Sequence, residues 1–273
     1  MKTILASFSV FALSVAAAEA AGFEILTPHR AVYDVKLVDA KDRSGIEGME
    51  GRIVYELTGN ACDGVSIQYR FVTRINTGND MFVTDQQSAS HESADGTEFS
   101  FSTKSFVNEQ ADQNVTGTAV RQGGGITVMH AGEEPGTQQL PDGLFTSSHL
   151  VAVLESAQAG EAFVSHTIFD GSGDADRLLN SATVIGKART VDSAMEGETG
   201  ADLETLFEKQ AFPMTMSYFN ANADNTSESL PIYEASFLLY QNGVTRDLTM
   251  RYPDYELKAT ISELEFLDME SCG

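Results

Sequence analysis

Residues 65–71 read Val-Ser-Ile-Gln-Tyr-Arg-Phe, a strict alternation of apolar and polar side chains. Successive side chains of a β-strand point to opposite faces, so this stretch predicts a strand with one buried face and one face in water. The same period of two recurs at residues 31–37, 52–57, 99–102, 214–218 and 244–252, where Arg246 shares the apolar face. Alternation of this kind is typical of antiparallel sheets, and the chain is therefore predicted to be mainly β.

Turn residues separate the predicted strands. Asn242-Gly243 lies between two such runs and is a strong hairpin signal, because both residues tolerate the backbone angles of a tight turn. Asp95-Gly96, the glycines at 123–125 and Asp170-Gly171 mark further turns. Short strands between closely spaced turns predict a meander of about 12–14 antiparallel strands.

One segment departs from the strand period. Apolar residues between Leu144 and Leu154 follow helical spacing, Thr146 or Ser147 is placed to cap the first turn, and Gly160 is placed to end the helix. Residues 202–210 predict a second short helix or a loop with a helical turn. So many strands with one main helix predict a sheet curled into an open barrel, with the helix against its interior. Such an interior is either a cavity for an apolar or extended ligand or simply the core, and the sequence leaves both open.

The N-terminus has the pattern of an export signal. Lys2 is followed by an apolar run at residues 4–18, and Ala18-Glu19-Ala20 offers small residues for cleavage. The run is too short for a typical membrane span, which disfavours an uncleaved anchor helix, and no other window reaches about 18 apolar residues. We therefore predict a signal peptide at 1–20, cleaved near Ala20, and an exported protein without a membrane span. No linker or repeat divides residues 21–273, which are predicted to form a single domain.

The chain is strongly acidic. It has 273 residues, with 40 Asp and Glu against 17 Lys and Arg, and a formal charge of -23. Phosphate backbones and anionic lipid surfaces repel such a protein, so nucleic acid and anionic membranes are disfavoured as partners. The charge identifies no partner by itself, because it also serves solubility.

Cys62 and Cys272 are the chain's two cysteines. Two lone cysteines of an exported protein usually pair. A redox-active pair is disfavoured because no C-x-x-C spacing exists, and a metal site is disfavoured because two thiols are too few ligands.

The sequence offers no catalytic residue that we would name. The five histidines, none in a close pair, are His29, His91, His130, His149 and His166. His29 is read either as a carboxylate ligand or, more simply, as a hydrogen-bonded structural residue. His149 follows Ser147-Ser148, but no G-x-S-x-G motif supports a hydrolase.

Metal and cofactor signals are equally weak. Residues 170–176 place oxygens at alternate positions, as calcium loops do, but Ala175 and Ser181 stand where an EF-hand needs Gly and Glu. Phosphate-binding and dinucleotide motifs are missing from the sequence, so no metal and no cofactor is predicted.

Several blocks of sequence together resemble the EipB-type cell-envelope integrity family, periplasmic proteins of alphaproteobacteria. The blocks are Leu26-Thr27-Pro28-His29-Arg30-Ala31-Val32-Tyr33-Asp34, Gly51-Arg52-Ile53-Val54-Tyr55-Glu56, Cys62-Asp63-Gly64, Arg70-Phe71-Val72-Thr73, Leu230-Pro231-Ile232-Tyr233-Glu234-Ala235-Ser236-Phe237, Gly243-Val244, Arg251-Tyr252 and Cys272-Gly273. The resemblance implies a β-spiral, an open barrel of many antiparallel strands around an interior helix. It also implies a disulfide between Cys62 and Cys272 and a role in envelope maintenance under stress. The segment at 192–210 does not match the family pattern well, and its role is left open.

The leading hypothesis is a non-enzymatic periplasmic protein that supports envelope integrity, acts as a monomer and holds a peptide or lipid-like ligand in a β-spiral cavity. Because the chain has no Trp, any aromatic lining of that cavity falls to Phe and Tyr. One alternative is a scaffold that contacts another envelope protein through a strand edge or a loop, without a small ligand. A hydrolase acting on envelope polymers is the third hypothesis.

Overall fold

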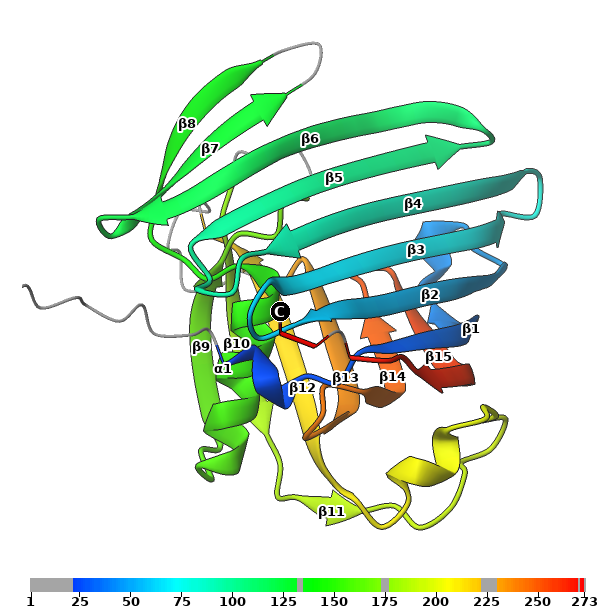
Figure 1. Cartoon of the computed structure of the whole chain (residues 1–273). Coiled ribbons are helices and arrows are strands. Elements are labelled where there is room, and N and C mark those ends of the chain that lie inside the picture. The colour runs from blue at the N-terminus through cyan, green and yellow to red at the C-terminus, as the bar shows by residue number, and fades with distance from the viewer. Residues whose placement is uncertain (1–21, 132–134, 173–176, 222–229, 270, 273) are drawn as a thin grey trace, which may run out of the picture.

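The computed structural model describes residues 22–131, 135–172, 177–221, 230–269 and 271–272 (Figure 1). The predicted signal peptide therefore lies outside the described residues. The strands are β1 (His29–Ala40), β2 (Gly48–Asn60), β3 (Gly64–Asn76), β4 (Met81–Glu92), β5 (Glu98–Val107), β6 (Gln110–Gln122), β7 (Gly125–Ala131), β8 (Gly136–Pro141), β9 (Phe163–Ile168), β10 (Leu179–Ile185), β11 (Arg189–Thr190), β12 (Gln210–Asn220), β13 (Tyr233–Tyr240), β14 (Thr245–Arg251) and β15 (Tyr255–Phe266). The helices are α1 (Thr146–Gln158) and the short 3-10 turns η1 (Phe23–Ile25), η2 (Asp42–Ser44) and η3 (Leu203–Leu206).

The strands form one continuous antiparallel sheet in the order β8-β7-β6-β5-β4-β3-β2-β1-β15-β14-β13-β12-β10-β9, with β11 paired to β12. The sheet curls so that β3 to β6 face β12 to β15 across the interior, and α1 lies inside the curl beside β9 and β10 (Figure 1). The prediction of a mainly β, curled antiparallel sheet with one interior helix is confirmed. The 15 strands of the described chain slightly exceed the predicted number.

The alternating runs became strands in the expected way. Residues 65–71 lie within β3, where Val65 and Phe71 are buried and Arg70 is exposed. The predicted hairpin at Asn242-Gly243 joins β13 to β14, and Gly243 adopts a φ of 89°, which favours glycine.

Buried apolar side chains inside the curl form three clusters. One cluster packs α1 residues such as Val153 and Leu154 against Leu57 of β2 and Met214 of β12. A second packs four phenylalanines, Phe99, Phe101, Phe145 and Phe169, where β5 to β7 meet the loops around α1. A third joins β1, β14 and β15 to the segment that carries η3.

The two ends of α1 are stabilised by different interactions. Gly160 follows its C-terminus with a φ of 82°, so its predicted role is confirmed. The predicted N-cap is wrong, because Phe145 occupies that position and no local side chain caps the helix. The carboxylate of Glu92 on β4, 55 residues away from Ser147, accepts a hydrogen bond from that residue's backbone N–H instead.

Candidate functional site

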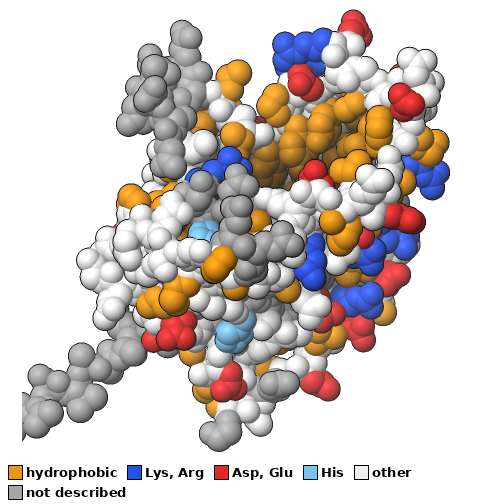
Figure 2. Space-filling view, turned by 90° about the horizontal axis from the view of Figure 1, so that it is seen from above, with side chains coloured by type: hydrophobic (Ala, Val, Ile, Leu, Met, Phe, Trp, Pro, Cys, Tyr) orange, Lys and Arg blue, Asp and Glu red, His pale blue; other side chains and the backbone are white. Residues whose placement is uncertain are grey.

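Seen from above, the molecule has a hollow whose wall is rich in hydrophobic side chains (Figure 2). Inside the curl, the inward-facing residues of β3 and β4 lie opposite those of β12 to β15 (Figure 1). We treat this hollow as the candidate functional site, because a concave surface with apolar and polar groups is where proteins usually hold ligands.

Four tyrosines form one wall of the hollow, which we call the tyrosine wall: Tyr218, Tyr233, Tyr252 and Tyr255. Tyr218 and Tyr233 are cross-strand partners on β12 and β13, with ring centroids 4.8 Å apart and planes 4° from parallel. Tyr252 stacks between Tyr233 and Tyr255 at centroid distances of 5.6 Å and 4.7 Å. The four rings thus make a continuous stack, and each remains partly exposed.

Tyr69 of β3 approaches this wall from the opposite side of the hollow. Burial raises the pKa of Tyr69, and the nearby Tyr252 raises it further. Burial likewise raises the pKa of Tyr252 to about 12, with a further contribution from Tyr255. These phenols therefore stay neutral at any physiological pH and offer hydroxyl groups without charge.

The facing wall is polar but uncharged. Alternate residues of β4 point inward and form what we call the polar row: Thr84, Gln86, Ser88 and Ser90. Ser88 pairs with Tyr69 across the strands. The Thr84 hydroxyl lies 2.6 Å from that of Thr73, whereas the side chains of Gln86, Ser88 and Ser90 make no hydrogen bond within the described part of the chain.

Apart from Glu92, the charged residues of β3 and β4 lie on the outer face, where Arg70 pairs with Asp85 at 2.8 Å. On the neighbouring strands β2 and β1, Arg52 pairs with Asp34 at 2.8 Å. The inward positions of β3 from Val65 to Ile75 and of β4 from Phe82 to Ser90 hold no ionisable group other than Tyr69. A charged ligand placed here would lose its hydration without gaining a partner, so this part of the hollow suits an uncharged one.

The end of β4 closes the hollow against α1. Glu92 is 1% exposed and accepts hydrogen bonds from the backbone N–H groups of Ser147 (2.9 Å) and Ser148 (3.2 Å), and from the Ser148 hydroxyl. Burial raises the pKa of Glu92, and the serine hydrogen bonds oppose this shift. The carboxylate thereby holds the start of α1, where the free N–H groups favour a negative charge.

The same helix places a histidine pair next to the sheet. The His149 Nε2 lies 2.9 Å from the Ser181 hydroxyl, and its ring centroid lies 5.4 Å from that of His166 on β9. Burial lowers the pKa of His149 to about 4, and His166 lowers it further. Ser181 is only 1% exposed, and no carboxylate bonds His149 among the described contacts. This pair therefore lacks both the access and the third group that a catalytic triad needs.

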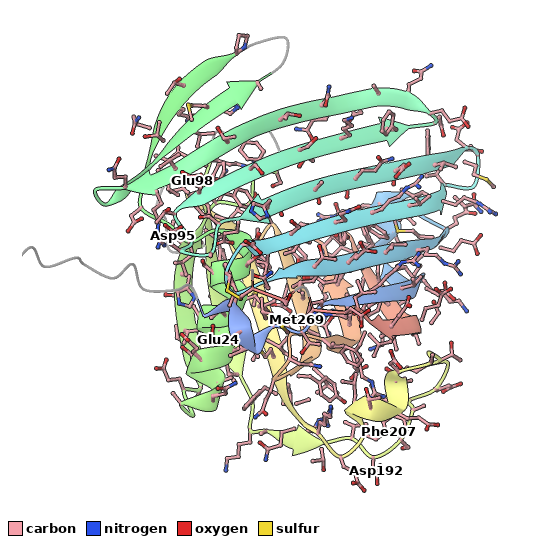
Figure 3. All side chains as sticks on the ribbon, viewed as in Figure 1. Glu24, Asp95, Glu98, Asp192, Phe207 and Met269 are labelled. Carbon is pink, nitrogen blue, oxygen red and sulfur yellow. A yellow bond between two sulfur atoms is a disulfide. The ribbon has the colours of Figure 1, made fainter. Side chains whose placement is uncertain are left out.

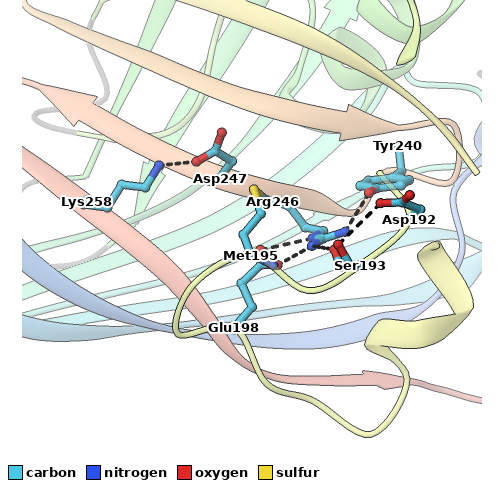
Figure 4. Close-up of polar contacts among 8 residues, drawn as sticks. All are labelled: Asp192, Ser193, Met195, Glu198, Tyr240, Arg246, Asp247 and Lys258. Atoms are coloured by element: carbon cyan, nitrogen blue, oxygen red, sulfur yellow. Dashed lines mark hydrogen bonds and ion pairs between the residues drawn. The ribbon is translucent and has the colours of Figure 1, made fainter. Parts of the chain in front are cut away.

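The segment whose role was open, residues 192–210, runs beneath β12 to β15, with Asp192 and Phe207 marking its two ends (Figure 3). It forms η3 rather than a second α-helix, and Leu203 and Leu206 are buried in the core. Arg246 of β14 holds the segment from inside: it donates to both carboxylate oxygens of Glu198, to the Tyr240 hydroxyl and to the Ser193 carbonyl (Figure 4).

Cys62 and Cys272 form a disulfide with a Cα–Cα distance of 5.7 Å, the pairing that the resemblance implies. It ties the turn between β2 and β3 to the chain after β15, across 210 residues. This disulfide lies outside the hollow and contributes no group to it.

The remaining predicted residues do not assemble a site. His29 is 1% exposed, its Nδ1 lies 2.7 Å from the Thr27 carbonyl, and its ring packs on Tyr55. It is thus a structural histidine and binds no carboxylate in the described chain. His91 on β4 and His130 on β7 border one pocket and take no part in the His149–His166 contact. Residues 173–176 of the acidic loop lie outside the described residues, and the rest of the described chain contains no cluster of three metal-ligating side chains.

The tyrosine wall and the polar row were missed as a site by the sequence reasoning. The wall's residues are scattered over residues 218–255, and only the strand register brings them together. The one available signal was the lack of Trp, which left aromatic lining to Phe and Tyr.

Comparison with known proteins places this architecture in context. The family model described as EipB-like matches residues 20–268. The cell envelope integrity protein EipB of Brucella abortus (strain 2308) is 37% identical over 256 residues, which cover 92% of this chain and 88% of that protein. A crystal structure of a beta-barrel-like protein of the DUF1849 domain from Brucella abortus superposes with a TM-score of 0.82 at 36% identity, covering 89% of this chain and 99% of that one. Among the described residues, no helix has the length and hydropathy needed to cross a membrane. The chain belongs to the EipB-like family.

Proposed function

We propose that this protein is exported through a signal peptide at residues 1–20 to the periplasm, where residues 21–273 act as one domain, a non-enzymatic monomer that supports cell-envelope integrity under stress. The name of the 37% identical Brucella relative supports the envelope role. The disulfide supports an oxidising compartment, because such bonds rarely persist in the cytosol.

We further propose that the hollow holds an extended ligand, a peptide or a lipid-like molecule, whose bound portion is uncharged. The observation that carries this proposal is the pair of facing walls. Stacked phenol rings offer apolar contact, and the free side chains of Gln86, Ser88 and Ser90 offer hydrogen bonds. Polar groups left without partners in a core would be costly, which favours a ligand or water against them over a dry core.

A substitution that fills the hollow tests this function. Ser88→Trp projects an indole into the hollow, whereas Ala89→Trp, one residue along β4, projects the same group from the outer face. In a strain that lacks the gene, the Ala89→Trp protein should restore growth on a bile detergent and on a cell-wall antibiotic, and the Ser88→Trp protein should not. Both variants should fold, with melting temperatures close to that of the parent.

Two results would contradict the proposal separately. Unchanged sensitivity of the deletion strain removes the envelope role. Full complementation by Ser88→Trp, together with native mass spectrometry of periplasmic extracts that finds only ligand-free protein, would contradict the proposal of a ligand in the hollow.

A further inference from the structure

The curled sheet has two end strands, β8 and β9, and they differ in how their outer edges are protected. Proline cannot donate a hydrogen bond, and charged side chains disfavour pairing, so natural edge strands often carry one or the other. β8 ends on Pro141 and follows Pro135. β9 reads Phe-Val-Ser-His-Thr-Ile, a sequence of high strand propensity without proline, aspartate, glutamate, lysine or arginine.

The register shows which backbone groups of β9 face outward. Ile185 donates to the carbonyl of Ala162, so the paired positions toward β10 continue at Val164, His166 and Ile168. The N–H and C=O groups of Phe163 and Ser165 therefore point away from β10, and no backbone partner for them is found in the described chain.

The protein itself uses one end of this edge. Leu144, in the segment before α1, forms a parallel bridge with Ile168. The Leu144 N–H donates to the Thr167 carbonyl at 2.9 Å, and the Phe169 N–H donates to the Leu144 carbonyl at 2.8 Å. The chain then turns into α1 and leaves the rest of the edge uncovered. The edge thus already accepts an added extended segment over its last residues.

A pair of exposed apolar side chains adjoins the uncovered part. Phe163 on β9 and Val184 on β10 are cross-strand partners, and they are 58% and 56% exposed. An added strand next to β9 would place its own outward side chain beside Phe163 and remove some of this apolar surface from water.

Charge decides between a second copy and a different protein. Two copies would bring formal charges of -23 together over a short strand edge. Near the edge, Glu161 and Lys187 lie at one end, while Asp142, Asp170 and Arg177 lie at the other. These five residues carry one net negative charge, which together with the acidity of the whole chain favours a neutral or basic partner.

We propose that the free edge of β9 binds an extended, neutral-to-basic segment of another protein, which adds to the sheet as a further strand beside Phe163 and Ser165. The inference does not depend on the ligand proposed for the hollow, because no residue of the tyrosine wall or the polar row belongs to β9.

The test uses the whole mature chain and a synthetic peptide of about ten residues, with alternating threonine and valine between terminal lysines, a length that matches an ordinary strand. Ser165→Pro removes an N–H that the fold does not use and places a ring on the free edge, a change that edge strands tolerate. Ser165→Ala is the matched control. Binding should protect the amides of Phe163 and Ser165 from hydrogen exchange, and Ser165→Pro should weaken it about tenfold, as expected for about 1.4 kcal/mol, while Ser165→Ala should not.

A second arm keeps the test independent of any folding defect in the proline variant. The parent protein is titrated with the same peptide after N-methylation of alternate amides, which removes the N–H donors needed for strand pairing and leaves the side chains unchanged. Equal binding of both peptides, or protection elsewhere in the chain, would overturn the proposal. So would a dimer of the free protein in sedimentation that Ser165→Pro abolishes, because it would assign the edge to a second copy.

Discussion

Replacing Glu198 by alanine should destabilise the protein more than the loss of any ion pair on its outer surface. The Arg246 side chain is 0% exposed and the Glu198 side chain is 2% exposed, so water cannot solvate either charge if its partner is removed. The carboxylate accepts hydrogen bonds from two nitrogens of the guanidinium. Without it, the hydrogen-bond partners left to Arg246 among the described residues are the Tyr240 hydroxyl (2.9 Å) and the Ser193 carbonyl (3.2 Å).

The magnitude follows from that burial. Removing one partner of a buried ion pair leaves an uncompensated charge and typically costs about 3–5 kcal/mol. The matched control is Asp34→Asn, which breaks a pair with Arg52 whose side chains are 49% and 58% exposed. Exposed pairs contribute about 0–1 kcal/mol, so the control should be nearly neutral.

Urea unfolding followed by circular dichroism measures both free energies, and a loss of about 4 kcal/mol in a chain of this size corresponds to a melting temperature roughly 10 °C lower. A double variant, Glu198→Met with Arg246→Met, should recover most of the loss, because it removes both charges together. A Glu198→Ala loss below about 1 kcal/mol, equal to that of the control, would refute the reasoning.

Three further predictions follow from single contacts. Cys62→Ser should lower the melting temperature, since a loop of 210 residues gives about 5 kcal/mol at most in the chain-entropy model; the parent, unreduced, should weigh two hydrogens less than its reduced form. The pKa of His149 is about 4 in the folded state and 6.5 in the unfolded state, so the unfolded state binds the proton first as pH falls. Up to about 3 kcal/mol of stability is therefore lost between pH 6.5 and pH 4. In His149→Gln, the free energy of unfolding should depend less on pH over that range. Gly171→Ala should destabilise by about 1–3 kcal/mol in thermal melts, because φ is +67° and a new Cβ would lie 2.5 Å from the Phe101 ring.

Each of these predictions has an outcome that would contradict it, and Gly171→Ala also has a control variant. Equal melting temperatures for the parent and Cys62→Ser would contradict a stabilising role of the disulfide. An unchanged pH slope in His149→Gln would show that other groups titrate in that range. Gly123→Ala shares a positive φ of 65° but meets nothing within 4 Å, so an equal loss there would leave backbone strain, not the Phe101 contact, as the cause.

The fold was predictable wherever one face of a strand is dry. The runs at 31–37, 52–57 and 65–71 alternate because their inner residues pack in a core, and Asn242-Gly243 marked its hairpin correctly. β4 gives no such signal, because both of its faces are mainly polar: the inner face carries the hydroxyl and amide groups of the polar row, and the outer face carries Asp85, Gln87 and His91. A strand keeps the period where its cavity-facing residues are apolar or aromatic, as at Tyr69 of β3, and loses it where they are polar, as on β4.

The candidate site was less predictable than the fold, for a related reason. Its decisive pairs are distant: Glu92 contacts Ser147, and Tyr69 approaches Tyr252. The sequence places Arg246 on an apolar face but does not identify its partner, because Glu198 is one of many acidic residues and nothing local distinguishes it. The predicted cap failed likewise, since a remote carboxylate took the role that local serine and threonine usually fill.

The position of β15 has a consequence for how the chain assembles. β1 and β15 pair along their length in the middle of the strand order, with seven strands on the other side of β1 and the rest beyond β15. Hairpins on either side of the β1–β15 pairing form between strands that are close in sequence. The β1–β15 pairing itself joins residues more than 200 positions apart, which is a slow step in folding. β15, the last strand of the chain, is therefore central and not an edge strand. Until β15 pairs with β1, the two halves of the sheet share no strand pairing, and loss of β15 would separate them.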